Sequence, residues 1–295
     1  MAHASTHPAH PLPPVAPRRL LLAQRLLRGE GSVEVTAFRA GETLTTAVHG
    51  VSADGRLVVA HVPNLLGSLG AFHTPAPLDV RVDVLRDALD LTLPTRLASV
   101  HLLGTLRWCR DSAEVAELGL RGRVADLVAD VGPRVRVGVV ETQRILLHDV
   151  DGVAVFCRHT LPLTSRGLVD QAELADLADD VLGTAPEVLA DLADAVALGL
   201  LPGESTPLQV DTESLPESPA HALDADEAGV TLLRVRDGES TAVHVALPGA
   251  GRLDHSPRHA WRRLLDAIPA RVAGHQRPAE AVRVGAVQFN AVDAE

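Results

Sequence analysis

Two histidines stand at a spacing that can bind a metal ion. His255 and His259 are four residues apart, a spacing that places two imidazoles on one face of a helix. Ser256 and Pro257 argue against this site, because serine at the N-cap followed by proline is a typical helix start. His255 then lies outside the helix. We therefore expect surface and capping histidines here, and no metal site.

No serine or cysteine stands in a recognised catalytic pattern. The segment Gly67-Ser68-Leu69-Gly70 is one residue shorter than the Gly-x-Ser-x-Gly nucleophile elbow. Cys109 and Cys157 lie in separate apolar runs, where a free thiol behaves as a small hydrophobic group. Two distant cysteines form neither a zinc knuckle nor a disulfide framework. The catalytic residues are therefore unknown, and whether the chain is an enzyme stays open.

Acidic residues recur at helical spacing in two segments of the second half of the chain. We expect them to form solvated helix faces, because such charges usually face water. These residues are Asp176, Asp179, Asp180, Asp191 and Asp194. Trp108 and Trp261 are expected to be core or interface anchors in preference to cofactor platforms, since large aromatic side chains are usually buried.

The composition excludes several classes of function. The chain has 295 residues and a formal net charge of −11, which argues against nucleic acid and anionic membranes as partners. All 27 basic residues are arginine, which excludes lysine-dependent Schiff-base and Walker-A chemistry. No apolar run approaches the roughly 20 residues of a membrane span, and no secretory signal is recognised, so we expect a cytoplasmic protein. The lysine-free composition is typical of high-GC, actinobacterial-like genomes.

The first half of the chain alternates short β-branched runs with turn residues, after a leucine-rich helix over 18–28. An Asp-Gly pair at 54–55 predicts a hairpin, and residues 112–130 have helical spacing. Six or seven short strands with one or two helices fit a small barrel better than a doubly wound sheet. The expected strands are 32–38, 44–51, 56–62, 78–85, 97–109, 135–147 and 152–157.

The second half of the chain has a different pattern. Residues 168–182 carry a helical apolar stripe, and Thr184-Ala185-Pro186-Glu187 is a capping box that opens a second helix. Residues 202–219 are expected to be a loop, followed by a hairpin over 228–247. A last helix starts after Ser256 and is expected to end by Pro269. Helices followed by a two-stranded piece indicate an α+β region.

Segments 31–35, 45–50 and 53–60 follow one another as short strands, and 96–106 supplies a longer one. Their order resembles the FMN-binding split β-barrel, the fold of the pyridoxamine phosphate oxidase superfamily. Segment 150–155 is similar to the last barrel strand of the haem-utilisation (HugZ-type) branch. The later α+β region resembles the domain of unknown function appended in that branch.

The resemblance implies an α+β fold, with an N-terminal split β-barrel followed by a smaller α+β domain. The expected division is a disordered tail over 1–17, the barrel over 18–163, the appended domain over 164–272 and a C-terminal tail over 273–295. Split barrels of this kind usually bury their ligand groove in a two-fold interface, so a homodimer is expected by analogy.

The resemblance also suggests cofactor-binding residues. The stretch after the third strand, which holds phosphate or propionate groups in the family, has no basic residue here and leaves Asn64 and Ser68 as hydrogen-bond donors. A haem ligand in the family would come from a late histidine. His275 matches this description, with Arg277 nearby for a propionate. The paired histidines that the branch carries on a helix are absent from 182–187.

Two functions follow from the resemblance. The first is a haem- or flavin-associated split-barrel protein of the haem-utilisation type, with haem or FMN as cofactor and haem binding or degradation as its role. The second is a cofactor-free dimeric binding or regulatory protein that has lost the flavin site and acts on a protein partner. The missing basic and histidine residues favour the second function, whereas membership of the superfamily would favour the first.

Overall fold

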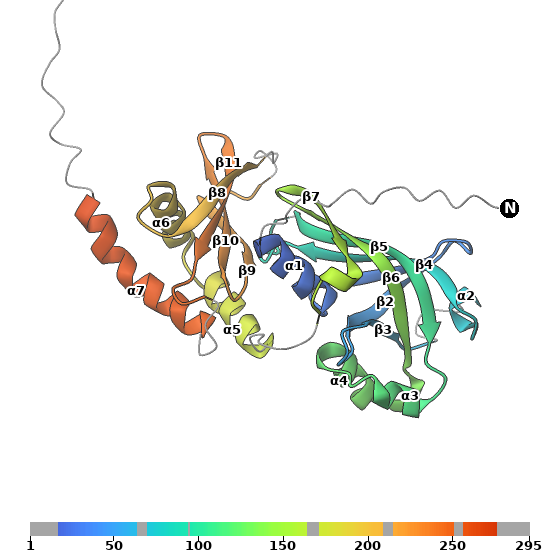
Figure 1. The fold of residues 1–295 in the computed structure, drawn as a ribbon. Helices are drawn as coiled ribbons and strands as arrows, with labels where there is room; N and C mark the ends of the chain where they lie inside the picture. Colours follow the sequence, from blue (N-terminus) through green and yellow to red (C-terminus); the bar gives the residue numbers. More distant parts are fainter. Residues whose placement is uncertain are drawn as a thin grey trace, which may run out of the picture.

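The computed structural model describes residues 17–63, 70–93, 95–163, 171–208, 215–250 and 256–275 (Figure 1). Six strands close into a barrel in the first half of the chain, and a four-stranded sheet with packed helices follows in the second half. This arrangement confirms the predicted α+β class with an N-terminal barrel.

The barrel is an antiparallel sheet whose two ends meet. The strand order is β3-β2-β1-β4-β5-β6, and the pairing of β3 with the first residues of β6 closes the ring. β7 pairs with the second half of β6 along the same edge. The strands are β1 Ser32–Ala37, β2 Glu42–Val51, β3 Leu57–His61, β4 Leu78–Asp87, β5 Arg96–Trp108, β6 Arg136–Asp149 and β7 Gly152–Cys157.

Alternation along β4 shows how the sequence builds this barrel. Val80, Val82 and Val84 belong to the buried core, and all three are fully buried. Arg81 and Asp83 therefore lie on the outer face, because successive side chains of a strand point to opposite sides. All seven strands expected in this half form. The Asp-Gly hairpin also forms, because β2 and β3 pair on either side of it.

The helices of the first half differ from prediction at one point. α1 (Pro17–Leu27) forms as expected, but the helix expected over 112–130 is two helices, α3 (Ser112–Glu117) and α4 (Gly122–Val131). Between them Gly119 has φ +56°, and a Cβ there would lie 2.8 Å from the Cβ of Ala53. The chain breaks where only glycine fits. The remaining short helices are α2 Gly70–His73, η1 Gly132–Arg134 and η2 Arg158–Thr160.

The second sheet is antiparallel, with strand order β8-β11-β10-β9. Helices α5, α6 and α7 pack around it, and Trp261 of α7 is fully buried in the shared core, as expected of an anchor. The elements are α5 Gln171–Leu182, α6 Pro186–Ala197, β8 Gly203–Leu208, β9 Ala220–Ala225, β10 Gly229–Arg236, β11 Glu239–Ala246 and α7 Pro257–His275.

The expectation of a loop over 202–219 and of only two strands is wrong. β8 lies within that stretch, and β9 begins directly after it. β8 is a mostly exposed edge strand that reads Gly-Glu-Ser-Thr-Pro-Leu, so it has no apolar alternation to identify it. Pro207 is compatible with this strand because an edge position does not need every N–H group.

Two helix ends also differ from prediction. α7 continues through Pro269 to His275, because a proline removes one backbone hydrogen bond without having to end the helix. The Thr184 hydroxyl donates to the Asp180 carbonyl at 2.8 Å, so it closes α5 and does not cap α6. The N-cap of α6 is Ala185, which has no side-chain cap. The expected serine cap of α7 is present, with the His259 N–H 3.2 Å from the Ser256 hydroxyl.

The barrel and the second sheet share backbone hydrogen bonds. The Leu89 N–H donates to the Leu223 carbonyl at 2.8 Å, and the Asp90 N–H donates to the Ala222 carbonyl at 2.9 Å. Beside these bonds lies an apolar cluster made of Ala88, Leu93, Leu97, Leu223, Leu233 and Ala242. The sheets are therefore packed as one body, while the expected boundary between 163 and 164 stays a prediction. Within the described ranges, the helices are too short or too polar to cross a membrane.

Burial of His49 makes stability depend on pH. Its Nε2–H donates to the Leu26 carbonyl at 2.5 Å, and the side chain is 2% exposed. Desolvation lowers the pKa of His49 to about 4, although the hydrogen bond to Leu26 opposes the shift. The unfolded chain therefore binds more protons between pH 6.5 and 4, and the folded state loses stability as pH falls through that window.

We predict that His49→Gln has a flatter dependence of unfolding free energy on pH. The loss between pH 6.5 and 4 attributable to His49 is on the order of 3 kcal/mol, from about 1.4 kcal/mol per pKa unit. Urea unfolding at several pH values measures it. His259→Gln, at an exposed histidine, is the control and keeps the wild-type slope. Equal slopes for all three proteins would contradict the assignment.

Candidate functional site

A cavity of about 770 Å³ lies at the end of the barrel where β5 stops and β6 begins. Its walls come from these strand ends, from η1, and from α3 and α4, which lie together at one end of the molecule (Figure 1). Its volume falls in the range of about 300–1,000 Å³ that is usual for small-molecule sites. Its lining includes Pro75, Trp108, Arg110, Val115, Val128 and Arg136.

Trp108 and Arg136 form the wall of the cavity at the strand ends. Trp108 is the last residue of β5 and Arg136 the first of β6. The Arg136 guanidinium lies 4.6 Å from the centroid of the indole ring, within the range of a cation–π interaction. Arg136 also donates a hydrogen bond to the carbonyl of Phe72 in α2. The centroid of the His61 ring lies 5.3 Å from that of the Trp108 ring.

The charges around this wall are poorly solvated. Burial lowers the pKa of Arg136, so its positive charge costs free energy in this position. Burial and then the charge of Arg136 lower the pKa of His61 to about 4, so its imidazole is neutral at pH 7. Among the described residues, no carboxylate pairs with Arg136. The buried Trp108 Nε1 and His61 Nε2 atoms likewise have no hydrogen-bond partner in that part of the chain.

The rim of the cavity is fixed by Glu114. Its carboxylate accepts a hydrogen bond from the Arg110 N–H at 2.9 Å and another from the Arg107 side chain. These bonds lower the pKa of Glu114 to about 2. Cys109, also at the rim, has a thiol pKa that is raised by burial, so it stays protonated and is a poor metal ligand. This thiol behaves as the expected small hydrophobic group.

This arrangement suits a flat, anionic ligand. The walls are largely apolar, and an aromatic ring borders the space. The Arg136 guanidinium is a donor for phosphate or carboxylate oxygens, whereas the exposed Arg110 guanidinium already pairs with Glu114 at 3.4 Å and would share its donors. No group of three or more histidine, cysteine or acidic side chains that could hold a metal ion occurs in the described ranges.

Of the site residues suggested by the family resemblance, His275 alone lies within the described ranges. Asn64, Ser68 and Arg277 lie outside the described residues, as does His255 of the histidine pair. His275 is the last residue of α7, which lies at the opposite end of the molecule from α3 (Figure 1). The roles expected for these residues stay predictions.

Several residues of the acidic helix faces form ion pairs with arginines of neighbouring elements. Asp180 accepts hydrogen bonds from Arg258 and Arg262, both of α7, and these arginines lower its pKa to about 2. Asp194 accepts two hydrogen bonds from Arg234 of β10. Asp176 likewise accepts a hydrogen bond from Arg258, at 2.6 Å. The expectation of a purely solvated face is therefore wrong for these three residues, because they tie their helices to neighbouring elements.

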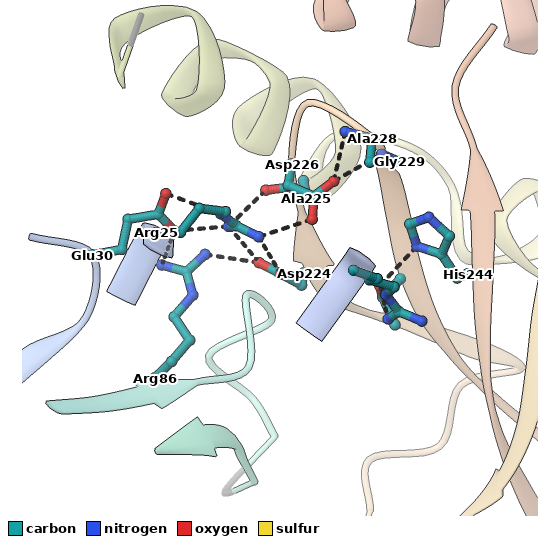
Figure 2. A network of polar contacts seen from close by, with 11 residues as sticks. Arg25, Glu30, Arg86, Asp224, Ala225, Asp226, Ala228, Gly229 and His244 are labelled. Carbon is teal, nitrogen blue, oxygen red and sulfur yellow. Dashed lines mark hydrogen bonds and ion pairs between the residues drawn. The ribbon is translucent and has the colours of Figure 1, made fainter. Parts of the chain in front are cut away.

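A buried charge cluster lies between α1 and the second sheet (Figure 2). Arg25 is 5% exposed, and its guanidinium contacts Asp224 at 2.7 Å, Glu30 at 2.7 Å and Asp226 at 3.0 Å. Arg86 of β4 also binds Asp224, at 3.0 Å. Burial alone would raise the pKa of Asp224, but the two arginines outweigh it and lower that pKa to about 2.

This cluster holds the fold and is not a binding site. Every charge in it has a partner inside the molecule, and the neighbouring space of about 20 Å³ is about the size of one water molecule. Arg18 extends the cluster by donating to the Thr231 hydroxyl at 3.0 Å, which lies 3.3 Å from His244 Nδ1. The cluster therefore joins α1, β4 and β9 through charge and hydrogen bonding.

Sequence reasoning missed the cavity. Trp108 was expected to be an anchor in preference to a cofactor platform, and neither His61 nor Arg136 belongs to a motif. These residues can be located only from the pairing of the strand ends, because His61 lies opposite Arg136 in the register of β3 and β6. That pairing closes the barrel, and it is not encoded in local sequence.

The chain matches no protein-family model and no curated protein. Among solved structures it is similar to a haem-binding protein from Mycobacterium smegmatis, with TM-score 0.41, 13% identity and coverage of 87% of this chain and 100% of the other. It is also similar to Atu2129 from Agrobacterium tumefaciens, a protein of unknown function, with TM-score 0.34, 12% identity and coverage of 85% and 95%.

A third similar structure is the general stress FMN/FAD-binding protein from Xanthomonas citri, with TM-score 0.29, 12% identity and coverage of 52% of this chain and 92% of the other. All three scores lie below 0.5. The function of this chain therefore has to be argued from its own residues.

Removing Arg25 is predicted to destabilise the protein strongly. Arg25→Met leaves Asp224 and Asp226 buried without their main partner, which costs about 3–5 kcal/mol of unfolding free energy. Arg96→Met is the control, because the Arg96–Asp87 pair is exposed and worth roughly 0–1 kcal/mol. Urea unfolding compares the two variants with the wild type. Similar small losses in both would mean that the buried cluster does not hold the fold.

Proposed function

We propose that the chain is a split-barrel protein that binds a flat cofactor with anionic side groups, of the haem or flavin class, in the barrel-end cavity. The observation that carries this proposal is Arg136, a partly buried arginine without a carboxylate partner among the described residues, beside a cavity of about 770 Å³. An anion bound there would offset the cost of desolvating that charge.

The residues present fit such a group. Arg110 and Arg136 would bind its phosphate or propionate oxygens, and the valine side chains of α3, α4 and β6 would contact its ring. Trp108 would border the ring, and neutral His61 would add no competing positive charge. A bound flavin would supply redox chemistry, and a bound haem would supply iron-centred chemistry, while the protein supplies binding and orientation.

Two observations distinguish FMN from haem as the ligand of this cavity. FMN needs no axial ligand, and its phosphate suits two guanidinium groups. Haem needs a side chain on its iron, and the cavity lining offers only the protonated Cys109 among the described residues. The other candidate ligand, His275, ends α7 at the opposite end of the molecule from this cavity (Figure 1). A protein that binds neither group, and acts on a protein partner, is the second candidate function.

We predict that FMN or haemin binds at one equivalent per chain, and that Arg136→Gln raises the Kd at least tenfold. The loss corresponds to one charge-assisted hydrogen bond, about 1.5–3 kcal/mol. Titrations followed by absorption distinguish a flavin shift from a Soret shift. The chain has two tryptophans and no tyrosine, so Trp261→Phe leaves Trp108 fluorescence as a second readout.

The matched control is Arg236→Gln, which makes the same change at an exposed arginine of the second sheet and is expected to bind like the wild type. Arg110→Gln is the second test variant, should Arg136→Gln fail to fold by circular dichroism. Absence of any shift with both compounds would overturn the cofactor proposal and favour the cofactor-free function.

We also propose that the chain forms a homodimer, as expected from the resemblance. Sedimentation equilibrium is predicted to give twice the mass of one chain at micromolar concentration. A monomeric mass at that concentration would contradict both the dimer and the analogy from which it comes.

A further inference from the structure

We propose that Ser99, His101 and Asp83 form a nucleophilic triad on the outer face of the barrel that reacts with small activated esters. Ser99 and His101 are two residues apart on β5, so both side chains lie on the same face. Asp83 lies opposite His101 in the register of β4 and β5. The valines between these positions, Val82, Val84 and Val100, face the core.

The distances are those of a relay from hydroxyl to imidazole to carboxylate. The Ser99 hydroxyl oxygen lies 2.8 Å from His101 Nε2, and His101 Nδ1 lies 2.6 Å from Asp83 Oδ1. A carboxylate only accepts hydrogen bonds, so Nδ1 of the neutral imidazole carries the proton. Nε2 is then the acceptor for the Ser99 hydroxyl, which is the tautomer that a general base needs.

Asp83 is held in the position that this role requires. Its side chain is 7% exposed, and its second oxygen, Oδ2, accepts a hydrogen bond from the Arg81 Nε–H at 2.7 Å. Oδ1 is thereby directed at His101. The ring of His101 keeps 38% of its side-chain surface exposed, so a proton can be passed to a leaving group from the solvent side.

The surroundings indicate which substrates fit. His148 lies opposite Ser99 in the register of β5 and β6, and its ring centroid is 5.0 Å from that of His101. An imidazole N–H in this position is a donor for the oxygen that becomes negative during attack. Ser99 itself is only 8% exposed, which restricts the reaction to small esters. A groove of about 290 Å³ is lined by Arg81 and Leu103, which stand two residues from Asp83 and His101 on their strands, and by Thr36, Phe38 and Thr43. Its apolar residues suit a short apolar group.

The proposed reaction is acyl transfer to Ser99. The Ser99 oxygen forms a bond to the ester carbonyl carbon while its proton moves to His101 Nε2. The carbon–oxygen bond to the leaving group then breaks, and the leaving alkoxide takes that proton from His101, which gives an alcohol and an acyl-serine. Water then gives a proton to His101 Nε2 and bonds to the acyl carbon, the bond from that carbon to the Ser99 oxygen breaks, and the carboxylic acid leaves. The Ser99 oxygen takes the proton back from His101, which restores the hydroxyl. This reaction requires no oxidant, metal ion or cofactor.

The first experiment is labelling of the full chain with a small fluorophosphonate, followed by peptide mass mapping. We expect one phosphonate on Ser99. The label should fall at least 100-fold in rate in His101→Gln and in Asp83→Asn, because the base or its orientation is lost. Ser205→Ala is the matched control, since Ser205 is an exposed serine on strand β8 without a histidine partner, and it should label like the wild type.

The second experiment measures hydrolysis of p-nitrophenyl acetate, with loss of the enzymatic rate expected in Ser99→Ala. Circular dichroism tests folding of each variant, and Asp83→Asn keeps the shape of the side chain if Ser99→Ala does not fold. A label elsewhere than Ser99, or labelling unaffected in both His101→Gln and Asp83→Asn, overturns the proposal. Arg136→Gln should label normally, so that failure of the cofactor site and failure of the triad are distinguishable.

Discussion

Arg25 is the residue on which the arrangement of the two sheets depends. Removing a guanidinium from water costs several kcal/mol unless carboxylates are fixed around it. Its partners come from the turn after α1, from β9 and from the loop after β9, and Arg86 of β4 shares Asp224 with it. The charge is therefore stable only when α1, the barrel and the second sheet are in place together. The same turn of α1 buries Leu26 and Leu27 in the barrel core, so apolar packing and ion pairing hold α1 in the same position.

With that packing fixed, β5 becomes the strand that positions both candidate sites. Its inward residues fill the barrel and end at Trp108, beside the cavity, whereas its outward residues place Ser99 and His101 next to Asp83. Strand pairing on both sides prevents β5 from slipping, because a shift of one residue would exchange the two faces. At Gly104, where β6 carries an irregularity, a Cβ would lie 2.4 Å from the Glu141 carbonyl oxygen. Glycine therefore lets β5 continue beyond that point to the cavity.

The sequence was sufficient to predict the barrel but not the sites. β-branched runs separated by turn residues predicted all seven strands of the first half, because alternation and turn chemistry are local signals. β8 carried no such signal, since it is a polar edge strand. The cavity and the triad depend on register: Asp83 meets His101 only when β4 pairs with β5, and His61 meets Arg136 only when β3 pairs with β6 and closes the barrel. Asn64, Ser68 and Arg277, which the family resemblance suggests, lie outside the described residues and stay predictions.

The two sites differ in how far their charged groups are already paired within the protein. At the barrel end, Arg136 is partly desolvated and no carboxylate among the described residues neutralises it, so the favourable change is the arrival of an anion. On the outer face, both oxygens of Asp83 are engaged and His101 already has a partner on each nitrogen, so an added ligand gains little from charge. The first arrangement therefore favours binding and the second favours proton transfer. Because inward and outward side chains of β5 do not contact each other, a ligand at one site leaves the hydrogen bonds of the other intact.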